Sequence, residues 1–386
     1  MTERTRDAIR YSLTVFIIVR LGLFLLGLAT VAVVVPVEPV DVPGWPAGDL
    51  PDPGLHNVFT AWERFDALWF LRIAEGGYID GDGSAAFFPA FPLLIRAVSF
   101  VIGGHPFAAA MIVSNIAFAA ALCVLYLLTA EERSVDTART TVLLLGAGPA
   151  SLFFYAPYSE ALFLLFAVVA FRSARHRSWA LAGGAALLGA LTRSIGVVIA
   201  AAIAIEAIHQ WLEGRRGSLL PGLAAAVAGG LGTAGYLVYW QFKGDDWLAP
   251  LHQQATWQRS FRWPWETLFD ATVRAYRYLG EANGGYWLLD WLLVVPVVAA
   301  AVYVAVRYRP AYALYVAAGI LIPLSYVFEP RPLMSMPRFV LPLFPAFWAI
   351  AEVLRRLQVP RAAVVGGSAA LLGVLTLLFV NWYYVF

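Results

Sequence analysis

The sequence has little of what several large classes of protein require. Its single cysteine, Cys123, leaves no basis for a disulfide framework or a cysteine-based metal site. Its five histidines are scattered along the chain, which predicts no metal centre. No glycine-rich phosphate-binding motif follows a strand pattern, so a nucleotide-binding domain is excluded. The formal net charge is only +2, which argues against nucleic acid as a partner.

Charged residues are also scarce. They make up 13% of the chain, against roughly 25% in a soluble domain. Hydrophobic residues make up 61%, and the mean hydropathy is +0.71. These values predict an all-α polytopic membrane protein. The apolar stretch Tyr11–Pro36 is long for a signal-peptide core and has no small-residue cleavage site, so it is predicted to be a retained first span.

Apolar runs alternate with charged loops along the whole chain. This pattern predicts about 11 transmembrane helices, within a range of about 9 to 12, in a single domain over residues 1–386. Arginines precede the first span and fill the loops at 172–177 and 213–217, which places these parts and the N-terminus in the cytoplasm. Two long loops then lie outside, at 36–105 with interfacial or re-entrant helices and at 243–285.

The segment 62–92 has the most unusual pattern in the chain. It is too charged to span a bilayer, yet its apolar residues recur at helical spacing, which predicts an amphipathic helix in the membrane interface. These apolar residues are Trp62, Phe65, Trp69 and Ile73. Glu63 and Asp66 are predicted to lie one turn apart on another side of this helix. Asp66 either reaches the head group of a lipid-linked substrate or only solvates the helix.

Other polar residues are predicted on the same outer side. Ionisable groups at the ends of apolar helices are costly and are often functional. Snorkelling, a favourable helix dipole and an aromatic interfacial belt are the alternative interpretations. The residues concerned are Tyr158, Ser159, Glu160, Arg193, His252, Gln253, Gln254, Trp257, Arg259, Arg331 and Arg338.

Five motifs in order resemble one family. ERFDALWFLRIAEGGY with FFPAFP, then GPASLFFYAPYSEALF, LTRSIGVV, QATWQR and MPRFVLPLFP are similar to motifs of the mannosyltransferases that add the second mannose to glycosylphosphatidylinositol precursors (GPI mannosyltransferase 2, PIG-V-like) and of their bacterial relatives. The similarity is scattered over about residues 60–350. Phe65 replaces the commoner tryptophan, and FFPAFP has phenylalanine in place of tyrosine, which should alter packing more than chemistry.

This resemblance implies a fold and an activity. The fold would be GT-C-like, with the active site on the extracytoplasmic face of a bacterial plasma membrane. The activity would be inverting transfer of mannose from a polyprenyl-phosphate donor to a lipid- or glycan-linked acceptor, among membrane lipids. Asp66 would be the general base. Arg338, Arg193 and Arg259 would bind the donor phosphate. Sugar or acceptor contacts would come from Glu160, Tyr158, Glu63, His252, Gln254 and Trp257.

Several alternatives stay open. A lipid-carrier transporter or scramblase would use the same arginines without transferring sugar, although the spans show little of a polar path. A purely structural membrane protein is disfavoured, because ionisable groups cluster on one face. Arabinose or glucose could replace mannose. No cofactor is expected; a divalent metal bound by Asp66 and Glu160 is a less favoured possibility.

Overall fold

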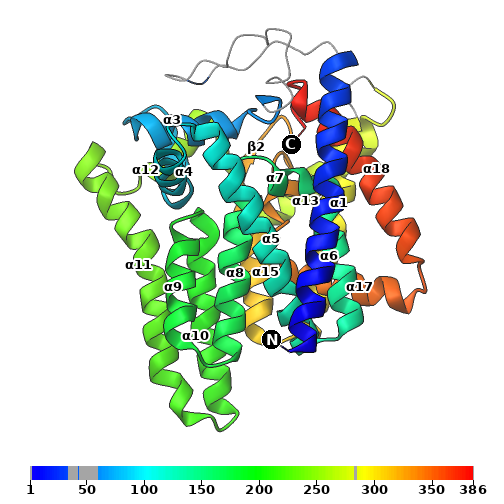
Figure 1. Ribbon diagram of the computed structural model, residues 1–386. Helices are drawn as coiled ribbons and strands as arrows, with labels where there is room; N and C mark the ends of the chain where they lie inside the picture. Colours follow the sequence, from blue (N-terminus) through cyan, green and yellow to red (C-terminus); the bar gives the residue numbers. More distant parts are fainter. Residues whose placement is uncertain (1, 34–41, 43–59, 282–284, 386) are drawn as a thin grey trace. The chain divides into compact units, whose positions relative to one another are not determined.

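The computed structural model describes residues 2–33, 42, 60–281 and 285–385, which are largely helical (Figure 1). Most of residues 36–59, in the first predicted outer loop, lie outside the described residues. The chain forms two compact units. Unit 1 comprises Met1–Ile79, Phe87–Leu165 and Leu357–Val385, and unit 2 comprises Asp80–Ala86 and Phe166–Arg356 with the last residue. The predicted single domain over the whole chain stays a prediction.

Unit 1 is built around the long helix α5. This helix packs against α1, α4 and α6, and α18 packs against α1 and α6. Its core is aromatic; for example, the Phe118 and Phe154 rings stack with centroids 4.5 Å apart. Helix α6 begins where the Ser134 side chain accepts a hydrogen bond from the Thr137 N–H at 3.1 Å, a normal N-cap. The elements are α1 (Glu3–Val33), α3 (Asp66–Gly76), α4 (Ala90–Val101), α5 (Pro106–Glu132), α6 (Val135–Gly146), η2 (Pro149–Ser151), α7 (Leu152–Tyr155), the first residues of α8 (Glu160–Arg175) and α18 (Arg361–Val380).

Unit 2 contains a bundle of α9, α10 and α11, and α10 also packs against α15. Gly229 permits the close approach of these helices, because a Cβ there would lie 2.7 Å from the Ala186 Cβ and 2.9 Å from the Ala200 Cβ. The helices are η1 (Ser84–Ala86), the rest of α8, α9 (Trp179–Ala190), η3 (Ser194–Gly196), α10 (Val197–Leu212), η4 (Arg216–Ser218), α11 (Leu219–Gly244), α12 (Ala249–His252), η5 (Gln253–Trp257), α13 (Pro264–Arg277), α14 (Gly285–Arg307), α15 (Pro310–Leu324), α16 (Met336–Phe339) and α17 (Phe344–Arg356).

A short two-stranded sheet in unit 2 was not predicted from the sequence. Strand β1 (Arg259–Phe261) pairs antiparallel with β2 (Tyr326–Phe328), and Arg259 lies opposite Phe328. The sheet joins the second predicted outer loop to the segment after α15. It therefore brings together two segments whose paired residues are 65 to 69 positions apart in the sequence.

The structure confirms an all-α polytopic membrane protein. Within the described ranges, six helices are long and apolar enough to span a membrane: Glu3–Thr30, Pro106–Glu132, Ser194–Leu212, Arg216–Gly244, Gly285–Arg307 and Arg361–Val380. A seventh span is possible in the pair Pro149–Tyr155 and Glu160–Arg175, which bends by 91°. Helices α4, α9 and α15 are shorter and apolar. The predicted total of about 11 spans stays a prediction.

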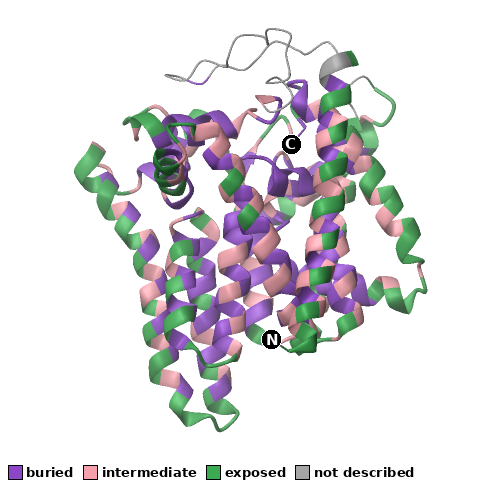
Figure 2. Ribbon diagram, viewed as in Figure 1, coloured by how far each residue is buried: buried purple, intermediate pink, exposed green. Residues whose placement is uncertain are grey.

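The exposed surface of the long helices fits contact with lipid. Figure 2 shows exposed positions along α1 and α11, which include Ile18 at 65%, Leu25 at 61% and Phe242 at 86% exposure. Large apolar side chains exposed repeatedly along a helix are typical of surfaces that face a partner or a membrane. The chain is therefore an integral membrane protein.

Two local predictions were wrong. The helix after Trp62 begins only at Asp66, so Glu63 and Asp66 do not lie one turn apart on a helix. All residues from Ala67 to Ala74 are buried, so α3 is an internal helix rather than one with a broad solvent-facing side. The proline at 337 predicts that Arg338 lies in the first turn of a long span, but Arg338 lies in the four-residue helix α16. Pro342 prevents α16 from continuing as a long helix, and the long helix α17 begins at Phe344, with Pro345 in its first turn, where proline is tolerated.

Candidate functional site

In unit 1 the candidate base Asp66 is the first residue of α3, after a turn that we call the Asp66 turn (residues 62–66). Phe65 has a φ of 54°, a left-handed conformation that is uncommon for a side chain of this size. Three aromatic rings hold it there: the centroids of Phe379, Trp382 and Tyr384 lie 5.1–5.6 Å from that of Phe65. A strained backbone maintained by its surroundings is common at functional sites.

Arg64 fastens the same turn through its main-chain contacts. Its Nε donates to the Val380 carbonyl at 2.9 Å, and its Nη1 donates to the Thr60 and Glu63 carbonyls at 3.0 and 2.9 Å. Its guanidinium carbon lies 4.5 Å from the centre of the Trp382 ring. Burial lowers the pKa of Arg64 to about 10, partly offset by the Glu63 carboxylate, so the side chain is charged at neutral pH. Arg64 was not among the predicted site residues, and its role is to hold the turn.

Tyr158 also contacts the Asp66 turn, although it lies 94 residues after Arg64 in the sequence. Its hydroxyl donates to the Arg64 carbonyl at 3.1 Å, and its own carbonyl accepts from the Ser114 hydroxyl at 3.2 Å. Tyr158 and Glu160 are each 1% exposed, and Glu160 is the first residue of α8. The sugar- or acceptor-binding roles of Tyr158, Glu160 and the half-exposed Glu63 stay predictions. The geometry favours a positioning role for the Tyr158 hydroxyl.

In unit 2 the three predicted phosphate-binding arginines meet at one aromatic ring. The guanidinium carbons of Arg193, Arg259 and Arg338 lie 5.4, 5.5 and 5.2 Å from the centre of the Phe339 ring. We call these four residues the arginine cluster. The two largest ring distances together keep any pair of guanidinium carbons within about 11 Å of each other. Three positive charges at this spacing create a strong local attraction for an anion.

The turn between α9 and α10 positions Arg193. The Arg193 N–H donates to the Gly189 carbonyl at 3.3 Å, and the Arg193 carbonyl accepts from the Gly196 N–H at 2.8 Å. Only glycine fits at 196, because a Cβ there would lie 2.2 Å from the Gly189 carbonyl oxygen and 2.5 Å from the Ala190 Cα. The LTRSIG motif thus forms a tight turn whose glycine is required for the close approach of α9.

The β1–β2 pair positions Arg259. Its Nη1 donates to the Tyr326 carbonyl at 3.2 Å, and its Nη2 donates to the Ser335 hydroxyl at 3.2 Å. Ser335 has a φ of 67° and is followed directly by α16, whose residues include Arg338 and Phe339. Arg259 is therefore connected to the backbone that positions Arg338 and Phe339.

The remaining predicted residues of the second outer loop have hydrogen-bond partners within unit 2. The His252 Nδ1 lies 2.8 Å from the Asp246 Oδ2, and the Gln254 Nε2 donates to the Pro250 carbonyl at 3.3 Å. Trp257 lies two residues before Arg259. Its Nε1 donates to the Gly83 carbonyl at 3.4 Å. Their sugar- or acceptor-binding roles stay predictions.

Gln253 has a structural role that the sequence did not reveal. Its Oε1 accepts from the backbone N–H groups of Gly83 and Ala85 at 3.1 and 3.2 Å, and its side chain is buried. Nothing in the repeated Gln-Gln pattern distinguishes it from Gln254. Phe339 was also not predicted, although it lies in the MPRFVLPLFP motif beside Arg338.

Acidic and histidine side chains do not gather as a metal centre in the part of the chain that the structure describes. In residues 2–33, 42, 60–281 and 285–385, no group of three or more His, Cys, Asp or Glu side chains has a suitable arrangement. Among the candidate site residues, Glu63, Asp66 and Tyr158 meet at the Asp66 turn, and Arg193, Arg259 and Arg338 meet in the arginine cluster.

Comparison with known proteins confirms the resemblance seen in the motifs. Residues 50–215 match the family model described as mannosyltransferase (PIG-V). This range includes Asp66, Tyr158, Glu160 and Arg193, whereas Arg259 and Arg338 lie beyond it. No curated protein matches the sequence.

Several solved structures are similar at low identity. ArnT from Cupriavidus metallidurans, bound to undecaprenyl phosphate, is 14% identical with a TM-score of 0.49, over 97% of this chain and 76% of that one. The archaeal oligosaccharyltransferase AglB from Archaeoglobus fulgidus, in complex with an inhibitory peptide and a dolichol-phosphate, is 14% identical with a TM-score of 0.43. The match covers 97% of this chain and 56% of that one. An Archaeoglobus fulgidus oligosaccharyltransferase complex with Zn and sulfate is 15% identical with a TM-score of 0.38, over 78% of this chain, which spans only 45% of that protein.

Proposed function

We propose that this chain, which resembles the mannosyltransferase (PIG-V) family over residues 50–215, is an inverting glycosyltransferase of the GT-C type. It would move mannose from a polyprenyl-phosphate donor to a hydroxyl group of a lipid- or glycan-linked acceptor. The observation that carries this proposal is the convergence of Arg193, Arg259 and Arg338 on the Phe339 ring. A membrane enzyme without a nucleotide-binding domain needs an activated sugar that the bilayer itself can supply.

The arginine cluster has the chemistry of a phosphate site. Guanidinium groups bind phosphate oxygens with paired donors and keep their charge at any physiological pH. The donor is a phosphodiester with one negative charge, and the leaving polyprenyl phosphate is a monoester with a charge of about −1.5 to −2. The attraction of the cluster therefore grows as the sugar–phosphate bond breaks, so it stabilises the transition state more than the bound donor.

Asp66 is the proposed general base. In the reaction, the acceptor oxygen forms a bond to the anomeric carbon while the bond from that carbon to the phosphate oxygen breaks. The bonding electron pair leaves with the polyprenyl phosphate, and the acceptor proton passes to the Asp66 carboxylate. An alcohol is a weak acid, so a positioned base is needed as its oxygen attacks. Asp66 is half-buried at the start of α3, directly after the restrained backbone of the turn.

The proposed site lies on the extracytoplasmic face of a bacterial plasma membrane, with the N-terminus in the cytoplasm. Support comes from the arginine-rich loops at 172–177 and 213–217, which the positive-inside rule assigns to the inner side. A cysteine probe in the 173–178 loop should then react only after the membrane is opened, and one near 250 should react in intact cells. Cytoplasmic labelling near 250 would contradict the proposed location of Arg259.

Transfer of radiolabelled mannose from polyprenyl-phosphate-mannose in membranes tests the function directly. We expect transfer with the wild-type chain and a loss of transfer with Asp66→Asn. The same assay with polyprenyl-phosphate arabinose and glucose tests the choice of sugar. Binding of the lipid phosphate without transfer of any of the three sugars would favour a lipid-carrier transporter instead.

A further inference from the structure

We propose that Asp290 is a positioning residue for the arginine cluster and acts through Arg331 and the loop 329–335. The proposal rests on the proposed function, because it assigns Asp290 to the phosphate site of that reaction. Asp290 lies in the second turn of α14, and none of the sequence motifs includes it.

Asp290 and Arg331 form a buried, two-pronged ion pair. The Arg331 Nε lies 2.6 Å from the Asp290 Oδ2, and the Arg331 Nη2 lies 2.8 Å from the Asp290 Oδ1. Side-chain exposure is 1% for Asp290 and 11% for Arg331. This bidentate geometry fixes the orientation of the guanidinium as well as its distance. The Arg331 guanidinium carbon also lies 4.9 Å from the centre of the Tyr286 ring, one turn earlier on α14.

The loop has a second attachment to neighbouring helices. The Pro330 carbonyl accepts hydrogen bonds from the Arg274 Nη1 at 3.0 Å and from the Trp287 Nε1 at 3.3 Å. Trp287 and Asp290 are on the same rigid helix, so consecutive loop residues are fixed to α14. The ion pair is thus part of a defined anchor for this loop.

The anchored loop leads directly to the phosphate-binding side chains. The Arg331 carbonyl accepts from the Met334 N–H at 2.9 Å, and the next residue is Ser335. The Ser335 hydroxyl accepts from Arg259, and its carbonyl accepts from the N–H groups of Arg338 and Phe339 at 3.1 and 3.0 Å. Ser335 thereby contacts three of the four members of the arginine cluster while it adopts a left-handed backbone conformation, so a shift of the loop would be transmitted to all three.

The energetics of buried ion pairs favour a positioning role over a stabilising one. The cost of removing two charges from water largely offsets their attraction, so such a pair contributes little net stability. Its loss nevertheless leaves the surrounding geometry without its anchor. Removing only one partner leaves the other charge buried and unpaired, so a change at Asp290 should lower the melting temperature as well as weaken phosphate binding.

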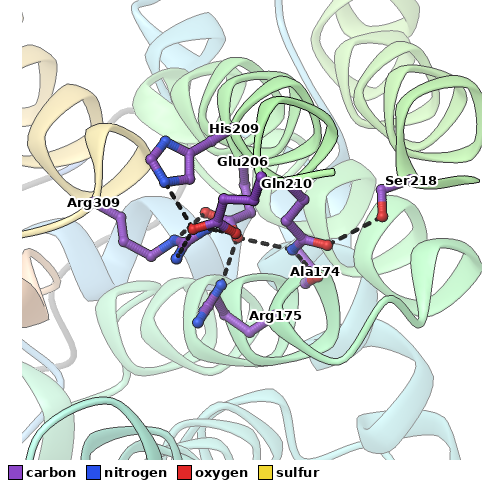
Figure 3. Close-up of polar contacts among 8 residues, drawn as sticks. Ala174, Arg175, Glu206, His209, Gln210, Ser218 and Arg309 are labelled. Atoms are coloured by element: carbon purple, nitrogen blue, oxygen red, sulfur yellow. Dashed lines mark hydrogen bonds and ion pairs between the residues drawn. The ribbon is translucent and has the colours of Figure 1, made fainter. Parts of the chain in front are cut away.

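Unit 2 provides a matched control in a second buried network (Figure 3). Glu206 on α10 is 2% exposed and receives the Arg175 Nη1 at 2.8 Å and the Arg309 Nε at 3.0 Å. It also accepts from the Gln210 Nε2 at 2.8 Å. About 14 Å of helix separates Glu206 from Val197, at the end of α10 that follows Arg193. Glu206→Gln therefore removes a buried paired carboxylate of the same unit far from the arginine cluster.

The test compares purified full-length wild type, Asp290→Asn, Arg331→Lys and Glu206→Gln in detergent micelles. Undecaprenyl phosphate is the binding probe; its Kd, the melting temperature and the KM values for the mannosyl donor and the acceptor are measured. We expect Asp290→Asn to weaken probe binding about tenfold and to raise the donor KM without changing the acceptor KM. Glu206→Gln should lower the melting temperature about as much as Asp290→Asn does, and it should leave probe binding within about twofold of wild type.

Arg331→Lys retains the charge but loses the bidentate geometry, and it decides the outcome if Asp290→Asn does not fold. Weaker binding by Arg331→Lys at a near-normal melting temperature supports the positioning role. If wild type binds the probe and both folded variants at 290 and 331 bind it equally well, this inference is overturned while the proposed function stands. Equal weakening by Glu206→Gln would also overturn it. If wild type does not bind the probe at all, the proposed phosphate site fails, and this inference fails with it.

Discussion

The Asp66 turn and the arginine cluster are held in place differently. Hydrogen bonds to main-chain carbonyls hold the turn that carries Asp66, whereas the three side chains of the arginine cluster share one aromatic ring. Arg64 and Tyr158 bind backbone carbonyl groups of the Asp66 turn, those of Glu63 and Arg64 respectively, and the Phe65 ring is surrounded by other rings. Arg193, Arg259 and Arg338 instead come from three distant segments and converge around Phe339. The comparison indicates that one group has a fixed backbone and the other depends on loop placement.

This difference suits the two proposed tasks. A general base must approach a single proton within hydrogen-bonding distance, so its position should tolerate little movement. A phosphate has several equivalent oxygens, and a group of guanidinium donors can bind it in more than one arrangement. Changes in the Asp66 turn should therefore affect turnover, and changes in the arginine cluster should also affect donor binding.

Asp66→Asn should have the largest effect. The amide keeps the size of the side chain but cannot accept the acceptor proton, and loss of a general base typically lowers the rate about 10²- to 10⁴-fold. Donor binding should change little, because the phosphate contacts are assigned to other residues. The measurement is initial-rate mannosyl transfer together with the Kd for undecaprenyl phosphate.

Glu63→Gln is the control for Asp66→Asn and should reduce transfer far less, because Glu63 precedes the helix and is not the proposed base. If Asp66→Asn kept more than about a tenth of the wild-type rate, Asp66 would be a structural residue.

Arg338→Lys should have the next largest effect. Lysine keeps the positive charge but cannot present two parallel N–H donors to the phosphate. We expect kcat to fall about tenfold, the equivalent of about 1.4 kcal/mol in the activation barrier, with little change in melting temperature. The exposed Arg355→Lys, on α17, controls for the substitution itself. Free replacement of Arg338 by lysine would instead favour snorkelling to lipid head groups.

Phe339→Leu should have a smaller effect and tests whether the shared ring matters. Leucine keeps an apolar side chain but removes the ring face beside three guanidinium groups, each interaction being worth about 0.5–1 kcal/mol at an accessible site. We expect the donor KM to rise about fivefold while kcat changes less. Phe242→Leu, on an exposed position of α11, is the matched control. An unchanged donor KM would show that the arginines are positioned without the ring.

The same contrast explains what the sequence could predict. Apolar runs and charge patterns predicted the membrane class and most long helices, because these features are local. The LTRSIG and MPRF motifs supplied Arg193 and Arg338, but helical periodicity misplaced the start of α3. The reason is physical: Trp62 and Phe65 have helical spacing because they pack in an aromatic core with Phe379, and the strained Phe65 backbone interrupts the helix.

The convergence on Phe339 could not be read from the sequence. It depends on the pairing of β1 with β2 and on the left-handed conformation of Ser335, and neither is encoded by spacing within a single segment. Both strands are only three residues long, so their propensity signal is weak. The Asp290–Arg331 pair was missed for the same reason, since its partners are 41 residues apart.

Tyr158→Phe should have the smallest effect, and it separates a positioning role from the predicted sugar contact. The substitution removes the hydroxyl that donates to the Arg64 carbonyl, a part-buried acceptor that keeps its bond from the Ala67 N–H, and this loss costs about 0.5–1.5 kcal/mol. Tyr155→Phe is a closely matched control, because the Tyr155 hydroxyl donates to the Gly146 carbonyl at 3.0 Å in the same unit. Both variants should lower the melting temperature by about 2 °C. Only Tyr158→Phe should also lower kcat, about threefold, with unchanged KM values, because only its partner lies in the Asp66 turn. A raised KM for donor or acceptor with an unchanged melting temperature would instead assign the Tyr158 hydroxyl to the substrate and would weaken the contrast between a main-chain-fixed base and a loop-dependent phosphate site.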